Sequence, residues 1–373
     1  GQMIRFRISD FGFWNLPSSI FCFRCIIISF LVLLVSGCGS SATRETLKKV
    51  ETLSEFHDYE KALNLLRDKI RLHPDEPKLQ EAFAVVLLKM GRVDLARTAC
   101  AQTAKKFPRR NFLIDALGNP DPRVREGAAR LVGFQKNARA ASPLLKLLKD
   151  REVNVRQAAV SALGELRIAK AADGLRRALE DKSWLVRADA AEALRKIGDH
   201  ASVPNLITAL RDEEAYVRHV AGRAVQELVL PSHQVVLQNA LKNENRTIRI
   251  VAAMSLARLK DTQAVPILNT CLEDTDWAVR RDAVAGLALL LERNALPEIR
   301  KRLSDSEVQV RMEAVDAIRK FKDFDSLVDL ERVVNNNRED RNVRLAAYTV
   351  AREILLQQQK KEGTPSFAVP AHP

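Results

Sequence analysis

One sequence unit recurs through the C-terminal two thirds of this 373-residue chain at a nearly constant interval of 31 residues. Each copy is marked by an apolar residue followed by arginine, and alanine stands three residues after every one of these arginines. The arginines are Arg125, Arg156, Arg187, Arg218, Arg249, Arg280, Arg311 and, after a two-residue insertion, Arg344. Such a period predicts a stack of similar units rather than one globular core.

The composition indicates that each unit is built from helices. Only 14 glycines and 5% aromatic residues argue against a large mixed or all-β core, and 29% charged residues supply a solvated face. Leucines recur one helical turn apart, as at Leu206 and Leu210. The repeated alanine suits the crossing of two close helices, where no branched side chain fits. We therefore expect an all-α chain in which each unit is a pair of packed helices.

The turn between units is marked by a residue six positions before the repeat arginine. This residue is Asp150, Asp181, Asp212, Asp274 or Asp305 in five copies, Asn119 or Asn243 in two, and Arg338 in the last. A short side-chain oxygen at a turn suits helix N-capping. The arginines can pair with these acids within their own unit or in a neighbouring one. We therefore interpret the eight arginines as a structural ladder that fixes the stacking.

This unit resembles the short HEAT-like repeat, of roughly 31 residues, first named for phycobilin lyases. The resemblance covers residues 111–358, about eight units. It implies a right-handed α-solenoid of stacked helix pairs, in which the second helices usually line the concave face. We read the last helix as a polar cap and residues 359–373 as a disordered tail.

A different interval, 34 residues, separates Ala62 from Ala96 and Pro74 from Pro108. The turn and helix start at Asp58-Tyr59-Glu60-Lys61-Ala62 and its counterpart ending at Ala96 resemble the tetratricopeptide repeat. The resemblance implies two such helical repeats over residues 44–110. Because no flexible linker follows, we expect them to continue into the HEAT-like array as one superhelix.

The N-terminus has the anatomy of a secretory signal. A short apolar run, Ile26 to Val35, follows basic residues and ends in small ones. The segment Val35-Ser36-Gly37-Cys38 resembles the lipobox of bacterial lipoproteins. The resemblance implies that residues 1–37 are a removed signal peptide, that Cys38 carries a covalent lipid, and that residues 38–43 form a tether. Because Gly39 is not Asp, it also implies the outer membrane, facing the periplasm. The alternative is an uncleaved hydrophobic anchor or a chance Gly-Cys pair.

A net charge of +13 favours acidic partners, and it suits acidic protein, anionic lipid or nucleic acid equally well. The solvent side of the second helices is expected to form a basic concave groove. Its candidate contact residues are Lys146, Lys149, Arg176, Arg177, Arg211, Lys242, Arg300 and Lys301. Trp184 and Trp277, at equivalent positions of their units, are candidate binding anchors. The alternatives are an ordinary solvated helix face and tryptophans that pack at the turns.

The sequence offers no constellation for catalysis. Its six histidines are scattered and none is followed by Glu, unlike the iron-binding pairs of HEAT-repeat hydroxylases. No metal spacing, phosphate loop or nucleophile elbow occurs. Cys22 and Cys25 lie in the signal, and Cys100 and Cys271 are expected to be small buried hydrophobes. We therefore expect no enzyme activity, no metal, no small-molecule substrate and no cofactor beyond the lipid.

These observations predict a non-catalytic scaffold for protein–protein interaction that is anchored in the bacterial cell envelope. Its partner is expected to be a protein, and the positive net charge favours an acidic one. One alternative is a nucleic-acid-binding HEAT-like protein, which would require that the signal does not function. The other is an enzyme similar to a phycobilin lyase, which an exported chain makes the least favoured reading.

Overall fold

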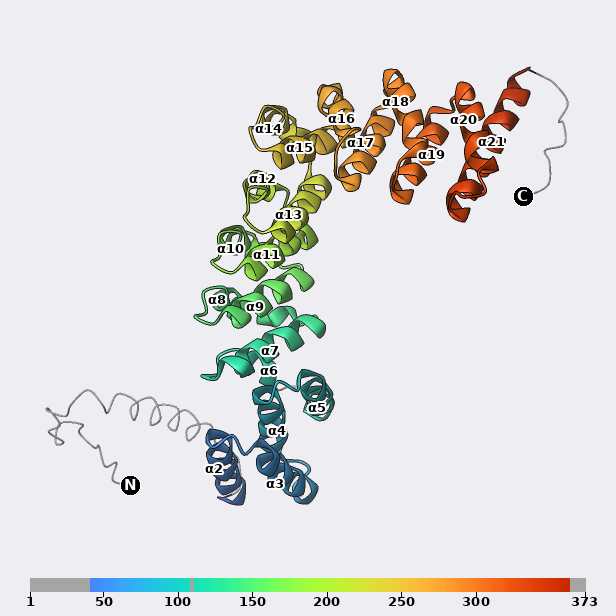
Figure 1. The fold of residues 1–373 in the computed structure, drawn as a ribbon. Helices are drawn as coiled ribbons and strands as arrows, with labels where there is room; N and C mark the ends of the chain where they lie inside the picture. The colour runs from blue at the N-terminus through green and yellow to red at the C-terminus, as the bar shows by residue number, and fades with distance from the viewer. Residues whose placement is uncertain (1–40, 108–110, 363–373) are drawn as a thin grey trace. The chain divides into compact units, whose positions relative to one another are not determined.

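The computed structural model describes residues 41–107 and 111–362, and every regular element in these ranges is helical (Figure 1). The predicted all-α class is therefore confirmed for the described residues. The chain divides into two compact units, Gly1–Arg110 (unit 1) and Asn111–Pro373 (unit 2). The predictions for residues 1–37, for Cys38 and Pro108, and for the tail from residue 363 onward fall outside the described residues.

The described part of unit 1 contains four helices that pack in chain order. They are α2 (Ser41–Glu55), α3 (Tyr59–Leu72), α4 (Pro77–Lys89) and α5 (Val93–Lys106). Ala62 and Ala96, which mark the 34-residue interval, are both fully buried at the starts of α3 and α5. Helix α2 begins at Ser41, so residues 41–43 are helical and do not belong to an extended tether. Thr43 and Thr46 are buried in this first part of α2, and the helix packs against α3 and α4.

Unit 2 is a stack of alternating long and short helices. The long helices are α7 (Pro122–Phe134), α9 (Val153–Glu165), α11 (Trp184–Ile197), α13 (Ala215–Leu228), α15 (Arg246–Arg258), α17 (Trp277–Leu290), α19 (Val308–Phe321) and α21 (Arg341–Glu362). The short helices are α8 (Ala141–Leu147), α10 (Ala172–Ala178), α12 (Val203–Ala209), α14 (Gln234–Ala240), α16 (Val265–Cys271), α18 (Leu296–Lys301) and α20 (Leu327–Asn335). The brief helix α6 (Phe112–Ala116) packs on α7.

Each long helix packs against the next long helix, and each short helix packs against the long helix that follows it. Unit 2 therefore has a long-helix layer and a short-helix layer, which is the expected solenoid of helix pairs. The repeat alanines lie where the long helices meet and are at most 2% exposed: Ala128, Ala159, Ala190, Ala221, Ala252, Ala283, Ala314 and Ala347. Helix α21 runs to Glu362, so residues 359–362 are helical, contrary to the predicted tail.

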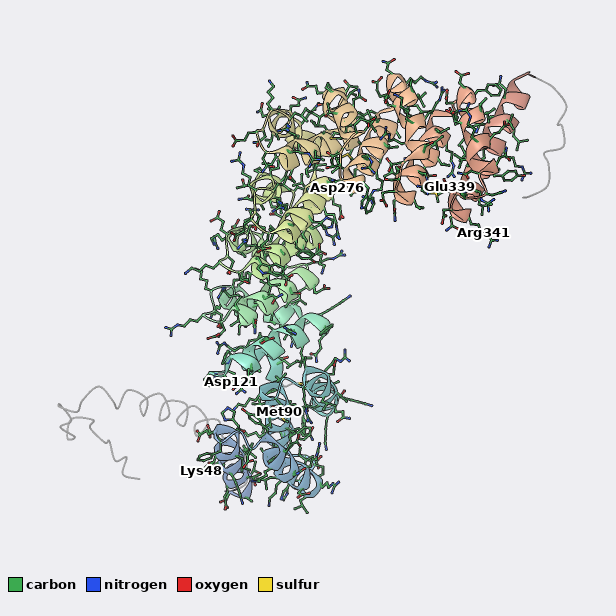
Figure 2. The ribbon with its side chains drawn as sticks, in the orientation of Figure 1. Lys48, Met90, Asp121, Asp276, Glu339 and Arg341 are labelled. Carbon is green, nitrogen blue, oxygen red and sulfur yellow. The ribbon has the colours of Figure 1, made fainter. Side chains whose placement is uncertain are left out.

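The turn acids do not cap the helices that follow them, which corrects the N-cap prediction. Asp150 stands two residues before the cap of α9, and its Oδ1 accepts the backbone N–H of Glu152 at 3.0 Å. True side-chain caps are found at Asp121 and Asp276, labelled in Figure 2, which accept the amides of Arg123 and Ala278. The repeat acids therefore stabilise the turn through this backbone bond, and both of their carboxylate oxygens can accept bonds from a further partner.

Within unit 2, Figure 1 shows the short helices along the outer side of the curve and the long helices along the inner side. The second helices therefore do not line the concave face, contrary to the expectation. The cause is the close approach of the long helices. A Cβ built at Gly164 of α9 would lie 2.9 Å from the Cα of Ala193 in α11, so little room separates these backbones. The long helices are the more tightly spaced layer, so they lie along the inner, shorter side of the curve of unit 2.

Candidate partner-binding surfaces

Two of the cations predicted to bind a partner are committed to ion pairs within the chain. Arg176 on α10 donates from Nε and Nη2 to the carboxylate of Asp199 at 2.8 and 3.0 Å. Arg300 on α18 donates from Nη2 to the carboxylate of Asp323 and from Nε to the Ser326 hydroxyl at 2.8 Å. Each acid lies 23 residues further along and opens the next unit's short-helix segment. These two arginines therefore fasten consecutive short helices, a second ladder that sequence reasoning missed.

Other predicted cations remain available to a partner. Lys146, Lys149, Arg177 and Lys242 are exposed, and within the described part of the chain their side chains have no ion pair or hydrogen bond. Arg211 is 52% exposed and makes only long contacts, 3.4 Å to Asn243 and 3.8 Å to Glu244. Lys301 pairs with Glu298 on its own helix.

We call the five residues Lys146, Lys149, Arg177, Arg211 and Lys242 the basic stripe. Lys146 and Arg177 occupy the same position in neighbouring units, as do Arg211 and Lys242. Lys146 and Arg177 lie on α8 and α10, whereas Lys149, Arg211 and Lys242 each lie two residues after the end of a short helix. An exposed row of cations of this kind attracts acidic surfaces in a salt-dependent manner.

The two tryptophans stand at the first position of long helices and contact their own chain. Trp184 meets Tyr216 edge to face, with ring centroids 6.1 Å apart, and so links α11 to α13. The guanidinium of Arg281 lies over the ring of Trp277 at 5.4 Å. Both rings stay partly exposed, at 40% and 37%. The contacts match the packing of tryptophan at the turns, and neither ring belongs to the basic stripe.

The repeat arginines connect successive units by a common set of bonds. Arg125 donates from Nε and Nη2 to Asp150 of the following unit at 2.8 and 2.9 Å, and from Nη1 to the carbonyls of Asn119 and Pro120 in its own turn. The same carboxylate bridge joins Arg156 to Asp181, Arg187 to Asp212, Arg280 to Asp305 and Arg311 to Glu339. Each bridge is largely shielded from water, with side chains at most 16% exposed.

The bridges shift the ionisation of the acids that accept them. Burial alone opposes the charge of Asp212, but hydrogen bonds from Arg187 and the backbone amide of Glu214 outweigh it. The pKa of the Asp212 carboxyl is consequently below its ordinary value, and the same balance lowers the pKa of Asp150, Asp181 and Asp305. The ladder is therefore charged at neutral pH.

The ladder is interrupted in the middle of unit 2. Arg218 faces the position of Asn243, which offers no carboxylate, and it bonds only the carbonyls of Asp212 and Glu213. Arg249 likewise bonds only carbonyls of its own turn, because Asp274 is paired with Arg246. In the last copy Arg338 stands in the acid's place and the neighbouring Glu339, labelled in Figure 2, accepts Arg311 instead. Arg344 has a buried Nε without a hydrogen-bond partner.

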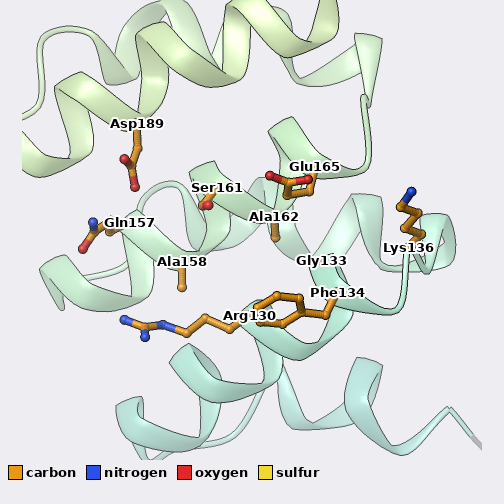
Figure 3. Close-up of a pocket in the computed structure, with 10 residues that line it drawn as sticks. All are labelled: Arg130, Gly133, Phe134, Lys136, Gln157, Ala158, Ser161, Ala162, Glu165 and Asp189. Atoms are coloured by element: carbon orange, nitrogen blue, oxygen red, sulfur yellow. The ribbon is translucent and has the colours of Figure 1, made fainter. Parts of the chain in front are cut away.

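A cavity of about 540 Å³ opens on the long-helix layer between α7 and α9 (Figure 3). Its floor is made by small residues such as Gly133, Ala158 and Ala162, and Asp189 reaches it from α11. Burial raises the pKa of the Asp189 carboxyl, and a hydrogen bond with Gln157 opposes that rise. No single repeat predicts this cavity, because three successive units supply its lining.

Two of the charged residues that line this cavity are paired within the chain. Arg130 pairs with Glu126 at 2.8 Å, and Glu165 pairs with Lys196 at 2.6 Å. The described residues hold no cluster of three or more His, Cys, Asp or Glu side chains that could bind a metal. Cys100 and Cys271 are buried free thiols, and burial raises the pKa of Cys100 to about 12. No described helix has the length and apolar character needed to span a bilayer.

Comparison with known proteins identifies the repeat. The family model for HEAT repeats matches residues 108–195, 141–226, 203–288 and 270–352. Similar solved structures include the YibA protein of Escherichia coli, at 22% identity over 64% of this chain and 91% of that chain, with a TM-score of 0.46. No curated protein sequence matches the chain.

Two further structures resemble the fold at low identity. The CpcE–CpcF complex of phycocyanin lyase from a Nostoc species shares 20% identity over 65% of this chain and 93% of that one, with a TM-score of 0.37. An engineered protein shares 19% identity over 88% and 98% of the two chains, with a TM-score of 0.47. The HEAT matches together span well over half of the sequence. The chain therefore belongs to the HEAT repeat family.

Proposed function

We propose that this chain is a non-catalytic scaffold that binds an acidic protein through the basic stripe. Repeat solenoids expose extended surfaces suited to binding, and the short-helix layer carries the stripe across neighbouring units. The short helices lie on the outer side of the curve of unit 2 in Figure 1, so we expect the stripe to form a convex basic face in place of a groove.

One observation carries this proposal. On the same layer, Arg176 and Arg300 have carboxylate partners within the chain, whereas Lys146, Lys149 and Arg177 have none in the described ranges. The exposed cations keep their positive charge at the surface, where an acidic partner can neutralise it. Exposed charges of this kind govern association rate and specificity more than fold stability.

Charge reversal tests the stripe. The variant Lys146→Glu with Arg177→Glu, expressed in the full chain, is expected to weaken partner capture by about tenfold, because like charges then face an acidic surface. The partner is identified by proximity labelling with the wild-type chain, and capture is measured by quantitative mass spectrometry at low and high salt. Both substitutions fall on exposed side chains, so the helical circular dichroism should be unchanged.

The matched control is Arg258→Glu with Arg352→Glu, which makes the same charge change on exposed residues of the long-helix layer. Capture should stay within about twofold of wild type in this control. Equal loss in both variants would mean that only net charge matters and would contradict the stripe. Recovery of nucleic acid in place of protein would contradict the proposed partner class.

The second part of the proposal is a lipid anchor on Cys38 that holds the scaffold in the cell envelope, at the outer membrane on its periplasmic side. The lipobox resemblance supports it, and only Gly39 and Ser40 separate Cys38 from the start of α2. Cys38→Ser removes the acylated sulfur, so the chain should move from the membrane to the soluble fraction on cell fractionation. Globomycin should block processing of the wild type.

Cys100→Ser is the matched control for the anchor. Cys100 is buried in α5, and its loss should leave the distribution between fractions unchanged. A Cys38→Ser chain that remains in the membrane fraction would exclude the lipid anchor and favour an uncleaved apolar segment.

A further inference from the structure

A second cavity, of about 470 Å³, lies wholly within unit 1. Helices α3, α4 and α5 supply its lining, which is distinct from the stripe and the cavity of unit 2. Among the described residues, its charged lining consists of Arg67, Arg71 and Lys106, without a carboxylate. Phe83, Ile70 and Ala99 give it apolar walls. A concave site with apolar walls and a few convergent polar groups is the usual form of a ligand pocket.

Contacts within the chain hold two of the cations in place. The Arg67 guanidinium lies over the ring of Phe83 at 5.8 Å. Lys106 donates from Nζ to the carbonyl of Pro74 at 2.6 Å and pairs with Asp75 at 2.9 Å. Asp75 is 88% exposed and stands outside the lining, so it offsets only part of the charge.

The third cation is uncommitted. Arg71, near the end of α3, is exposed and has no side-chain partner among the described residues. Its guanidinium carries N–H donors in a planar fork that matches a carboxylate. Counting Arg67, Arg71 and Lys106 against Asp75 leaves the cavity with excess positive charge.

The floor of the cavity is fixed by a polar network. Gln80 donates from Nε2 to the Pro74 carbonyl at 2.9 Å, so this carbonyl accepts from both α4 and α5. The hydroxyl of Thr103, itself buried, donates to the Ala99 carbonyl at 2.8 Å. The two bonds to the Pro74 carbonyl tie the turn between α3 and α4 to both α4 and α5. The cavity is therefore preformed, which lowers the entropic cost of binding a ligand.

We infer that this cavity binds a carboxylate of a protein partner, presented by an acidic side chain or by a C-terminus. The cations attract and orient the carboxylate, and the walls formed by Phe83 and Ile70 accept the methylene groups of the segment that carries it. The inference rests on the proposed scaffold function for the class of partner, but its site is separate from the basic stripe.

Fluorescence anisotropy with defined peptides tests the inference on the full-length chain. The probe is a fluorescein-labelled nonapeptide of alternating glutamate and glycine with a free C-terminus. Matched peptides carry an amidated C-terminus, glutamine in place of glutamate, or both changes. Retained binding of the amidated glutamate peptide assigns the site to side-chain carboxylates. Retained binding of the glutamine peptide with a free C-terminus assigns it to the terminal carboxylate.

Arg71→Gln is expected to weaken binding of the glutamate peptide by about tenfold, because one charge-assisted donor pair is lost without disturbing a buried contact. Lys49→Gln, on the exposed face of α2 and outside the cavity, makes the same charge change and should leave affinity within about twofold. Lys146→Glu with Arg177→Glu should also bind the peptide normally, so failure of the stripe and failure of this cavity can be told apart.

Three results would overturn the inference. The first is equal binding of the peptide to wild type and Arg71→Gln, and the second is equal binding of the doubly modified peptide, which has no carboxylate. The third is binding of phosphatidylglycerol vesicles that depends on Arg71 while the peptides do not bind. That outcome would assign the cavity to a lipid headgroup.

Discussion

Replacing Arg187 by alanine is expected to lower the free energy of unfolding by about 3 kcal/mol, because it breaks a buried ion pair and leaves one charge uncompensated. The Arg187 and Asp212 side chains are only 11% and 8% exposed. The substitution also removes the donors that satisfy the Asp181 and Lys182 carbonyls. Urea unfolding followed by circular dichroism, with hydrogen exchange of α11 and α13, measures the loss.

Arg218→Ala provides a control supplied by the chain itself. Arg218 occupies the same repeat position and bonds the Asp212 and Glu213 carbonyls at 2.7 and 2.8 Å, but it has no carboxylate partner. Its loss should cost only about 1 kcal/mol, the usual net value of such hydrogen bonds. The difference between the two variants measures the carboxylate contacts of Arg187, which are the bridge to Asp212 and a longer contact with Glu213 at 3.4 Å. Equal destabilisation would show that the carbonyl bonds, and not the bridge, hold the units together.

The repeat contacts of unit 2 were accessible from sequence because a fixed period forces equivalent residues into equivalent surroundings. The alanines had to lie at helix crossings for steric reasons, and an arginine and an acid kept at a constant separation had to meet between units. The second ladder was less visible. Arg176 and Arg300 stand four units apart, and other residue types occupy the same position in the units between them. The 31-residue period therefore does not reveal this pairing, and the sequence predicts both arginines as partner contacts.

The surfaces could not be predicted, because they depend on how units are spaced rather than on what one unit contains. The concave face was assigned to the second helices by resemblance, yet the close approach at Gly133 and Gly164 places the long helices inside. Residues from three helices line each cavity. In the cavity of unit 2, for example, α11 contributes Asp189. Residue types alone do not indicate that such positions converge.

Gly164→Ala is the second substitution with a large expected effect. A Cβ at this position would lie 2.9 Å from both Cα and Cβ of Ala193, closer than carbon atoms can approach, so α9 and α11 must move apart. Alanine gains about 1 kcal/mol over glycine in a helix, but overpacking of a backbone contact costs more. The net result should be a loss of about 2 kcal/mol in the free energy of unfolding, measured by urea unfolding.

Gly174→Ala separates a rigid contact from a flexible one. Its Cβ would lie even closer to a neighbour, 2.6 Å from Leu148 Cδ1, but that atom ends a side chain that can rotate away. Stability should therefore change little, although the built distance is shorter. If Gly164→Ala were neutral and Gly174→Ala costly, the long helices would not be held at contact distance. The tight inner layer would then fail to explain why the short helices, with the basic stripe, lie on the outer side of unit 2.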